Sequence, residues 1–185
     1  SNVAVGKSAL YANTSGDYNV AIGLNAGQGS TGNNNTSVGH EALKNSGSDA
    51  SNNTAVGYQA LTAITTGTPN VAVGSRALQA NTTGGENVAI GRDAMYANTT
   101  SSRNVAVGYG TLDAQTDGTG YNTAVGNNAL TLNTSGAYNT AVGANALDAN
   151  TTANDNTAVG YAALGANNEG HSNVAVGNYA GDAIT

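Results

Sequence analysis

Histidine is the residue type in this chain best suited to catalysis or metal binding, and the sequence places its two histidines far apart. His40 and His171 lie in unrelated sequence contexts. The dipeptide His40-Glu41 is followed by Ala and Leu rather than by a second His, so the zinc-protease motif is absent. The chain has no Cys, and Asp155, between two asparagines, is at best an isolated ion ligand in a solvated loop. We therefore expect no catalytic residue, no metal site, no cofactor and no enzyme activity.

Tyrosine supplies nearly all the aromatic character, with nine Tyr, no Phe and no Trp. Six tyrosines in variable stretches of the sequence could contact carbohydrate or protein, although stacking of these rings on neighbouring parts of the chain is an equally good interpretation. These weak ligand-binding candidates are Tyr18, Tyr58, Tyr109, Tyr121, Tyr138 and Tyr161.

Charge and hydropathy argue against nucleic-acid binding and against a membrane span. The five Lys and Arg residues are scattered and the formal net charge is −6, whereas nucleic-acid binding requires clustered positive charge. No run approaches the 18 consecutive apolar residues of a transmembrane helix. We expect neither a nucleic-acid partner nor a membrane span in this segment.

A tandem repeat of about 17 residues organises the whole chain. Each repeat opens with the pattern Asn-(Val/Thr)-(Ala/Ser)-(Val/Ile)-Gly, and we number repeat positions from that Asn. The sequence predicts a single tandem-repeat solenoid over residues 1–185, because a unit this short cannot bury its own core and must stack on its neighbours. The eleven repeats start at Asn2, Asn19, Asn35, Asn53, Asn70, Asn87, Asn104, Asn122, Asn139, Asn156 and Asn173.

Two short segments account for each coil. Positions 1 to 5 alternate β-branched and small residues, which favours a strand. Positions 8 to 13, typically Ala-Leu-x-Ala-x-Thr, predict a second strand, with a short helical turn as the alternative. Stacked at roughly 4.8 Å, eleven such coils make a parallel all-β solenoid on the order of 50 Å long. We expect position 1 to form an asparagine ladder and the position-5 glycine to adopt φ > 0 or permit close approach at a corner.

The alternation within the strand divides it into two faces. We expect positions 2 and 4, Val, Thr or Ile, to point inward with the Leu of position 9, and the small residues of position 3 to point outward. A flat outward face of alanine would pack closely against another copy of the chain, so we predict a homo-oligomer, with three chains favoured. That predicted contact comprises Ala4, Ala21, Ala55, Ala72, Ala89, Ala106, Ala124, Ala141, Ala158 and Ala175.

The strand motif resembles the head repeats of trimeric autotransporter adhesins, the YadA-like heads, and the related repeats of bacteriophage tail fibres. Residues 19–23 (Asn-Val-Ala-Ile-Gly) and 87–91 (the same five residues) match best, and the resemblance recurs in all eleven repeats. It implies a left-handed β-roll and an obligate homotrimer. The family unit is near 14 residues, shorter than this one, and its ligands do not carry over.

These observations predict a structural or adhesive segment of a surface-displayed fibre, either an adhesin head or a phage tail fibre. Such a segment is a stiff spacer that presents variable loops to a host surface carbohydrate or protein. It would be an excerpt of a longer chain, located extracellularly on a cell or virion surface. The alternative is an ice-binding solenoid that uses the threonine column at position 13, namely Thr14, Thr31, Thr65, Thr82, Thr99, Thr116, Thr134 and Thr151.

Overall fold

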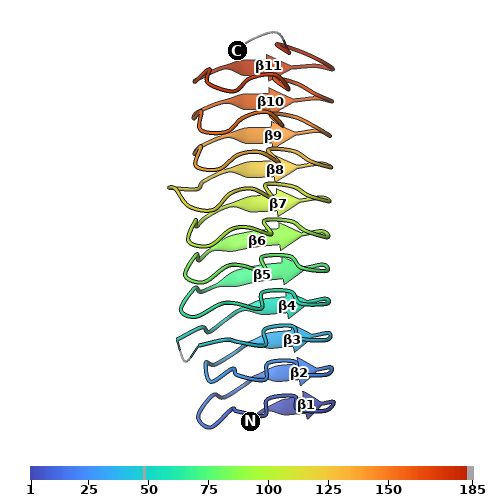
Figure 1. Cartoon of the computed structure of the whole chain (residues 1–185), viewed down its shortest axis with the longest axis vertical. Helices are drawn as coiled ribbons and strands as arrows, with labels where there is room; N and C mark the ends of the chain where they lie inside the picture. Colours follow the sequence, from blue (N-terminus) through green and yellow to red (C-terminus); the bar gives the residue numbers. More distant parts are fainter. Residues whose placement is uncertain (48, 183–185) are drawn as a thin grey trace.

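The computed structural model describes residues 1–47 and 49–182, which form an upright stack of coils with the two termini at opposite ends (Figure 1). Each coil contributes one short strand, and the eleven strands form one parallel sheet in which every strand pairs with the next in sequence. The strands β1 to β11 are Val3–Val5, Val20–Ile22, Thr36–Val38, Thr54–Val56, Asn70–Val73, Asn87–Ile90, Val105–Val107, Thr123–Val125, Thr140–Val142, Thr157–Val159 and Val174–Val176. The prediction of an all-β parallel solenoid is confirmed.

The sheet register is that of the repeat itself. Val88 of β6 pairs with Val105 of β7, and Ala89 pairs with Ala106, so equivalent repeat positions lie directly above one another. The same register holds across the 16- and 18-residue spacings, as where Val20 pairs with Thr36 and Thr36 with Thr54. Differences in repeat length are therefore absorbed in the loops.

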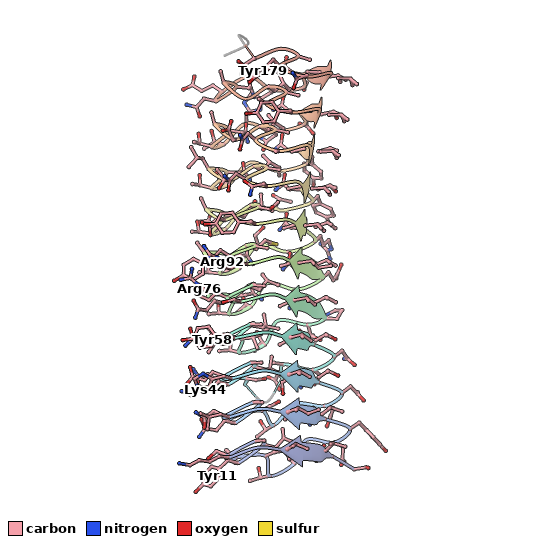
Figure 2. All side chains as sticks on the ribbon, turned by 90° about the vertical axis from the view of Figure 1, so that its right-hand side faces the viewer. Tyr11, Lys44, Tyr58, Arg76, Arg92 and Tyr179 are labelled. Carbon is pink, nitrogen blue, oxygen red and sulfur yellow. The ribbon has the colours of Figure 1, made fainter. Side chains whose placement is uncertain are left out.

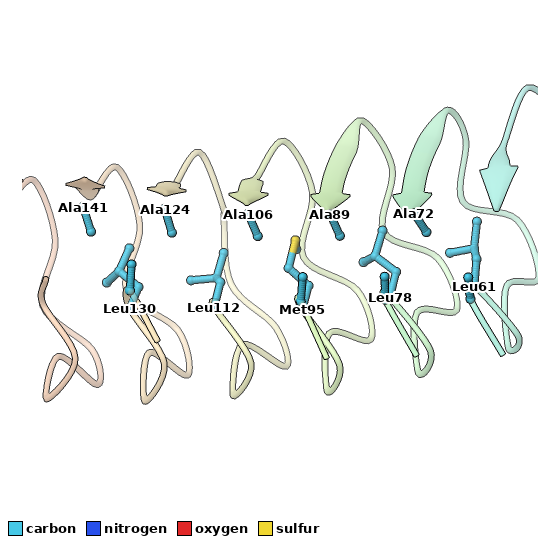
Figure 3. Packing of buried hydrophobic residues seen from close by; sticks show 14 of the residues in the cluster. Leu61, Ala72, Leu78, Ala89, Met95, Ala106, Leu112, Ala124, Leu130 and Ala141 are labelled. Atoms are coloured by element: carbon cyan, nitrogen blue, oxygen red, sulfur yellow. The ribbon is translucent and has the colours of Figure 1, made fainter. Parts of the chain in front are cut away.

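The interior of the coil is lined by alanine and leucine. Position-3 alanines such as Ala89 and Ala106 are 0% exposed, as are the position-9 residues Leu78 and Leu112. Figure 3 shows the alanines pointing from the strands toward the column formed by leucines and Met95. This core runs continuously through the stack, so each coil buries apolar surface only because a neighbouring coil covers it.

The predicted orientation of the strand is wrong. The alanines expected on an outer face lie in the core, whereas position-4 residues such as Ile22 and Ile90 are 41% and 40% exposed. The coil is so narrow that the strand and the leucine segment face each other with room for only a small side chain from the strand. A predicted oligomer contact through the alanine face is therefore wrong as well, because nine of its ten alanines are buried within one chain.

The predicted second strand is also absent from the described residues, where positions 8 to 12 form hydrogen-bonded turns. The leucines of position 9 have left-handed backbone angles, as in Leu61 (φ 52°) and Leu112 (φ 54°), which a strand cannot contain. Residues 1–47 and 49–182 contain no helix either. The same conformation is held by glycine where the repeat lacks a leucine, as at Gly27 (φ 55°).

Two polar columns fix one coil on the next. From Asn2 to Asn156, the side-chain oxygen of each position-1 asparagine accepts a hydrogen bond from the backbone N–H of the next such asparagine, for example Asn70 Oδ1 from Asn87 at 3.1 Å. The position-5 glycines have φ between 123° and 141°, and a Cβ at Gly91 would overlap the carbonyl oxygen of Gly108. The expected asparagine ladder and the expected constraint on glycine are both confirmed.

Candidate functional site

The first exposed surface is the outer side of the sheet, which we call the strand face and define as the side chains at positions 2 and 4 of every coil. All 22 of these residues are Val, Ile or Thr, and none is charged. All of them are exposed or half-buried, with Val142 36%, Val5 56% and Val176 70% exposed. Outward residues along a strand are about 6.7 Å apart and coils about 4.8 Å apart. The strand face is therefore a flat strip about 50 Å long and 10 Å wide.

The second surface is formed by positions 6, 7 and 10, which we call the ladder face. In Figure 2, Lys44, Tyr58, Arg76 and Arg92 lie on the side of the rod away from the strands. This face holds four of the five Lys and Arg residues in the chain, namely Lys7, Lys44, Arg76 and Arg92. The two surfaces thus divide the chemistry of the rod into an uncharged strip and a charged, aromatic one.

Asp93 is the centre of a group of contacts on the ladder face that joins the fifth and sixth coils. The guanidinium of Arg76 donates a hydrogen bond to the Asp93 carboxylate at 2.8 Å, and Arg92 lies 3.3 Å from the same carboxylate. Arg76 also lies over the ring of Tyr96, at 5.2 Å from its centroid. Ion pairs of this kind between neighbouring coils link the coils on the outside, with the modest energy of partly exposed pairs.

Carboxylates on the ladder face have shifted pKa values in opposite directions. The pKa of Glu41 is lowered to about 2, because its carboxylate accepts hydrogen bonds from Gln59 and Lys44. Burial raises the pKa of Asp113, and the nearby charge of Asp93 raises it further. Burial likewise raises the pKa of Asp148. These shifts follow from hydrogen bonding and burial, and these carboxylates do not surround a common centre.

The six candidate tyrosines do not form one site, because the structure divides them between two columns. Tyr18, Tyr121 and Tyr138 each lie two residues before a strand, whereas Tyr58, Tyr109 and Tyr161 each lie two residues after one, at position 6.

Stacking engages most of these rings. Tyr121 and Tyr138 stack with centroids 5.1 Å apart, and Arg103 lies over the Tyr121 ring at 5.3 Å. Arg92 lies over Tyr109 at 4.8 Å, the ring of His40 is 5.5 Å from that of Tyr58, and Tyr161 meets Tyr179 edge to face at 5.2 Å. Five of the six candidates therefore contact a side chain in a neighbouring coil, which supports the structural interpretation of those rings. Tyr18 is 68% exposed.

The histidines stay apart, as their sequence separation predicts. His40 lies in the third coil against Tyr58, and His171 lies in the tenth, where its Nδ1 accepts a hydrogen bond from the backbone N–H of Asn154 at 2.9 Å. Within residues 1–47 and 49–182 no three His, Asp or Glu side chains are grouped so that they could hold a metal ion. The same residues contain no helix long and apolar enough to cross a membrane.

The threonines of position 13 use their hydroxyls within the rod. Thr65 and Thr82 each donate a hydrogen bond, at 3.0 Å, to the backbone carbonyl of the equivalent threonine in the next coil. Thr99 and Thr134 do the same at 2.6 and 3.1 Å. This column therefore joins coils to one another through hydroxyls that also line the surface.

Comparison with known proteins assigns no family, since no protein-family model, no curated protein and no solved structure matches this chain.

Proposed function

We propose that this chain is a structural and adhesive segment of a surface-displayed fibre, and that copies of it associate through the strand face. The observation that carries this proposal is the uninterrupted strip of 22 outward Val, Ile and Thr residues along all eleven strands. A regular apolar strip of this length on a soluble rod is what a partner covers.

The size of the strip supports self-association. A strip about 50 Å by 10 Å offers roughly 500 Å² per copy, so a pair would bury about 1,000 Å², near the lower limit of specific interfaces. The column that precedes the strands widens the contact with Arg103, Tyr121 and Tyr138, and Tyr and Arg are enriched at interfaces. Three copies around a common axis would cover both edges of every strip, and we propose this homotrimer, with the left-handed winding that the resemblance to adhesin heads implies.

The ladder face supports the presenting role. Once the strand face is covered, positions 6, 7 and 10 remain on the outside of the bundle, where they vary from coil to coil between charged, aromatic and small residues. The rod then acts as a stiff spacer that displays this variable surface to carbohydrate or protein on a host, at a cell or virion surface. No step of this role requires bond-making chemistry.

The mass of the chain in solution tests the proposal. We expect light scattering during gel filtration to give three times the chain mass of 18.1 kDa. Val107→Glu places a charge in the middle of the strand face and should convert the assembly to monomers while circular dichroism retains its β signal. Asn127→Glu, at exposed position 6 of the next coil, is the matched control and should leave the oligomer intact.

Two results would contradict the proposal: a wild-type chain that stays monomeric at micromolar concentrations, or a Val107→Glu variant that assembles as well as the control.

Ice binding by the position-13 threonines remains the alternative, and no contact in the structure favours it. Hydroxyls that bond along the stack, such as that of Thr82, have fewer hydrogen bonds left to offer ice. Thermal hysteresis of the wild-type chain, lost in Thr82→Tyr and unaffected by Val107→Glu, would favour this alternative over the fibre.

A further inference from the structure

The net charge of the ladder face changes sign along the rod (Figure 2). Positions 6, 7 and 10 together are positive in the first and fifth coils and negative in the seventh, ninth and eleventh. The third and sixth coils contain both signs, as where Lys44 pairs with Glu41 at 2.7 Å, and the other coils have no Lys, Arg, Asp or Glu at these positions. The residues that give the five charged coils their sign are Lys7, Arg76, Asp113, Asp148 and Asp182.

This order of charges is complementary to itself when it is reversed. If a second copy lies antiparallel with full overlap, the first coil faces the eleventh, the third faces the ninth, the fifth faces the seventh, and the sixth faces itself. The coil of Lys7 then faces that of Asp182, and the coil of Arg76 faces that of Asp113. A two-fold contact makes each of these pairings twice, and no charged coil meets a coil of the same sign.

Lys44 and Asp148 form the most direct of these pairings. A two-fold axis along the strand direction keeps each repeat position opposite the same position of the other copy. Both residues occupy position 10, in the third and ninth coils, so their side chains face each other. The charges of the other pairings lie in different columns of the same face, and they attract over that offset because the screening length is about 10 Å in salt of about 0.1 M.

Side-chain size follows the same reversal at position 6. Each tyrosine of this column faces a smaller side chain, in the pairs Tyr58 with Asn127, Tyr109 with Ser75 and Tyr161 with Leu24. The three tyrosines are 44% to 47% exposed, so they are accessible to a second copy. In this alignment no ring of the column meets another ring, and two ladder faces can approach closely.

Other alignments lose the complementarity. A shift of one coil in either direction places each of the five charged coils opposite a coil without net charge, or beyond the end of the other copy. A shift of two coils places either the fifth or the seventh coil opposite itself, which brings like charges together. In a parallel arrangement without stagger, every charged coil lies beside its own equivalent.

We propose that the ladder face binds the ladder face of a second copy of this chain, antiparallel and with all eleven coils overlapping. The inference rests on the proposed presenting role of this face, and it names a partner for it. Rods that project from two facing surfaces run antiparallel where they overlap, so this pairing joins one fibre-bearing surface to another. Partly exposed ion pairs are individually weak and are screened by salt, so the pairing requires many faces acting together and weakens as salt is added.

Cross-linking tests the alignment, because the chain contains no cysteine. With a short bis-maleimide at low salt, Y96C should link to itself, since position 10 of the sixth coil lies next to the two-fold axis. T62C and T131C, at position 10 of the fourth and eighth coils, should link to each other in an equimolar mixture, and neither should link to itself. An affinity tag of different mass on one partner identifies the mixed product.

Exchange of charge between the third and ninth coils tests the cause. K44D and D148K each introduce a residue type that position 10 already has in another coil, so both should fold. Beads that carry the wild-type chain by one end should aggregate at low salt, and beads with either variant alone should not, whereas a mixture of the two variants should. The double variant K44D/D148K keeps the net charge of −6 and should aggregate with itself but not with wild-type beads.

E169K is the matched control for D148K, because it makes the same change of charge at an exposed site outside the ladder face. Beads that carry it should aggregate as the wild type does. A D148K variant that aggregates like E169K would show that the facing charges do not drive the pairing.

The outcomes separate this inference from the proposed function. The Y96C link should persist in the Val107→Glu background, because the pairing does not use the strand face. A chain that never trimerises but still forms this link contradicts the proposed homotrimer alone. A trimer in which Y96C forms no link, or in which T131C links to itself as readily as to T62C, overturns this inference alone.

Discussion

The carboxamide oxygen of Asn87 accepts a hydrogen bond from the backbone N–H of Asn104, one coil further along, at 3.0 Å. Ten such links join the eleven position-1 asparagines into one column, which is buried from Asn19 to Asn156. The Nδ2 of Asn104 is used as well, donating to the Ser101 hydroxyl at 3.0 Å. Asparagine is suited to this column because one side chain accepts a hydrogen bond from the next coil and, through its NH2 group, also donates, here to Ser101 of the preceding coil.

Replacement of Asn104 by Asp should therefore lower the stability of the fold considerably, although the two side chains have nearly the same size. Asp keeps the acceptor for the Asn122 N–H but loses both donors, and it places a carboxylate at a site that is 0% exposed. An uncompensated buried charge costs about 3–5 kcal/mol, whereas Asn104→Ala should cost about 1–3 kcal/mol through the unpaired N–H. Urea unfolding followed by circular dichroism measures both, with exposed Asn127→Asp as the control. An Asn104→Asp variant as stable as that control would show that the column contributes little.

Alanine substitutions at two glycines should distinguish the cost of backbone strain from the cost of a steric clash between coils. Gly91 and Gly177 share nearly the same backbone angle, φ 136° and 133°, but a Cβ at Gly91 would overlap Gly108, whereas at Gly177 the nearest atom would be Ala180 Cβ at 3.7 Å. Gly177→Ala should lower the free energy of unfolding by about 1–3 kcal/mol from backbone strain alone. Gly91→Ala should lower the midpoint of thermal unfolding considerably more, because the coils must also separate locally. Equal losses in the two variants would mean that stacking does not require glycine.

Because the pKa of Asp113 is raised, replacing this residue by Asn should increase stability in a pH-dependent way. Burial and the charge of Asp93 raise the folded-state pKa of Asp113 above its ordinary value of 3.8, so the folded chain binds this proton more tightly than the unfolded chain. Protonated Asp113 therefore contributes stability at low pH, and this contribution is lost as the pH rises from 3.8 through the higher folded-state pKa. Asp113→Asn should raise the thermal midpoint at pH 7 and leave it unchanged at pH 3.

Asp117→Asn removes the same charge from an exposed site in the same coil and serves as the control for net charge. A stabilisation by Asp113→Asn that persists undiminished at pH 3, or one that Asp117→Asn reproduces, would contradict the assigned cause.

The sequence predicted correctly those features that a repeat imposes at every coil. A period near 17 residues with β-branched residues in alternation required stacked parallel strands, since no single coil could bury enough surface to fold. The invariant Asn and Gly required a common backbone role, which the asparagine column and the glycine corner fulfil. These features depend on identity and spacing along the chain, which the sequence contains in full.

The direction in which each strand faces could not be derived from alternation alone. The prediction placed the larger side chains, such as Val88 and Ile90, inside, because larger apolar residues usually form the core. The signal that points the other way is the strict limit on size at position 3, which admits only Ala and Ser37. A position that never exceeds the volume of a few atoms is one where the neighbouring wall leaves no space.

The nature of the leucine segment depended on the same tertiary fact. Alternation at positions 9, 11 and 13 suggested a strand, but a leucine such as Leu112 enters the core from a left-handed backbone conformation, at φ 54°. Local propensity disfavours that conformation for leucine. It persists because the coil must turn sharply there and because the buried side chain, once covered by the coils on either side, holds the backbone in place.

The sequence by itself thus determined that this protein is a repeated coil, where its coils begin, and which residues recur at each level of the stack. Only the tertiary structure decided which side of the strand is inside, and so which surface is left for other molecules. The physical reason is the width of the coil. A sequence specifies side-chain volumes in order, but the space between two walls exists only once the chain has closed, and that space admits alanine and turns valine, isoleucine and threonine outward.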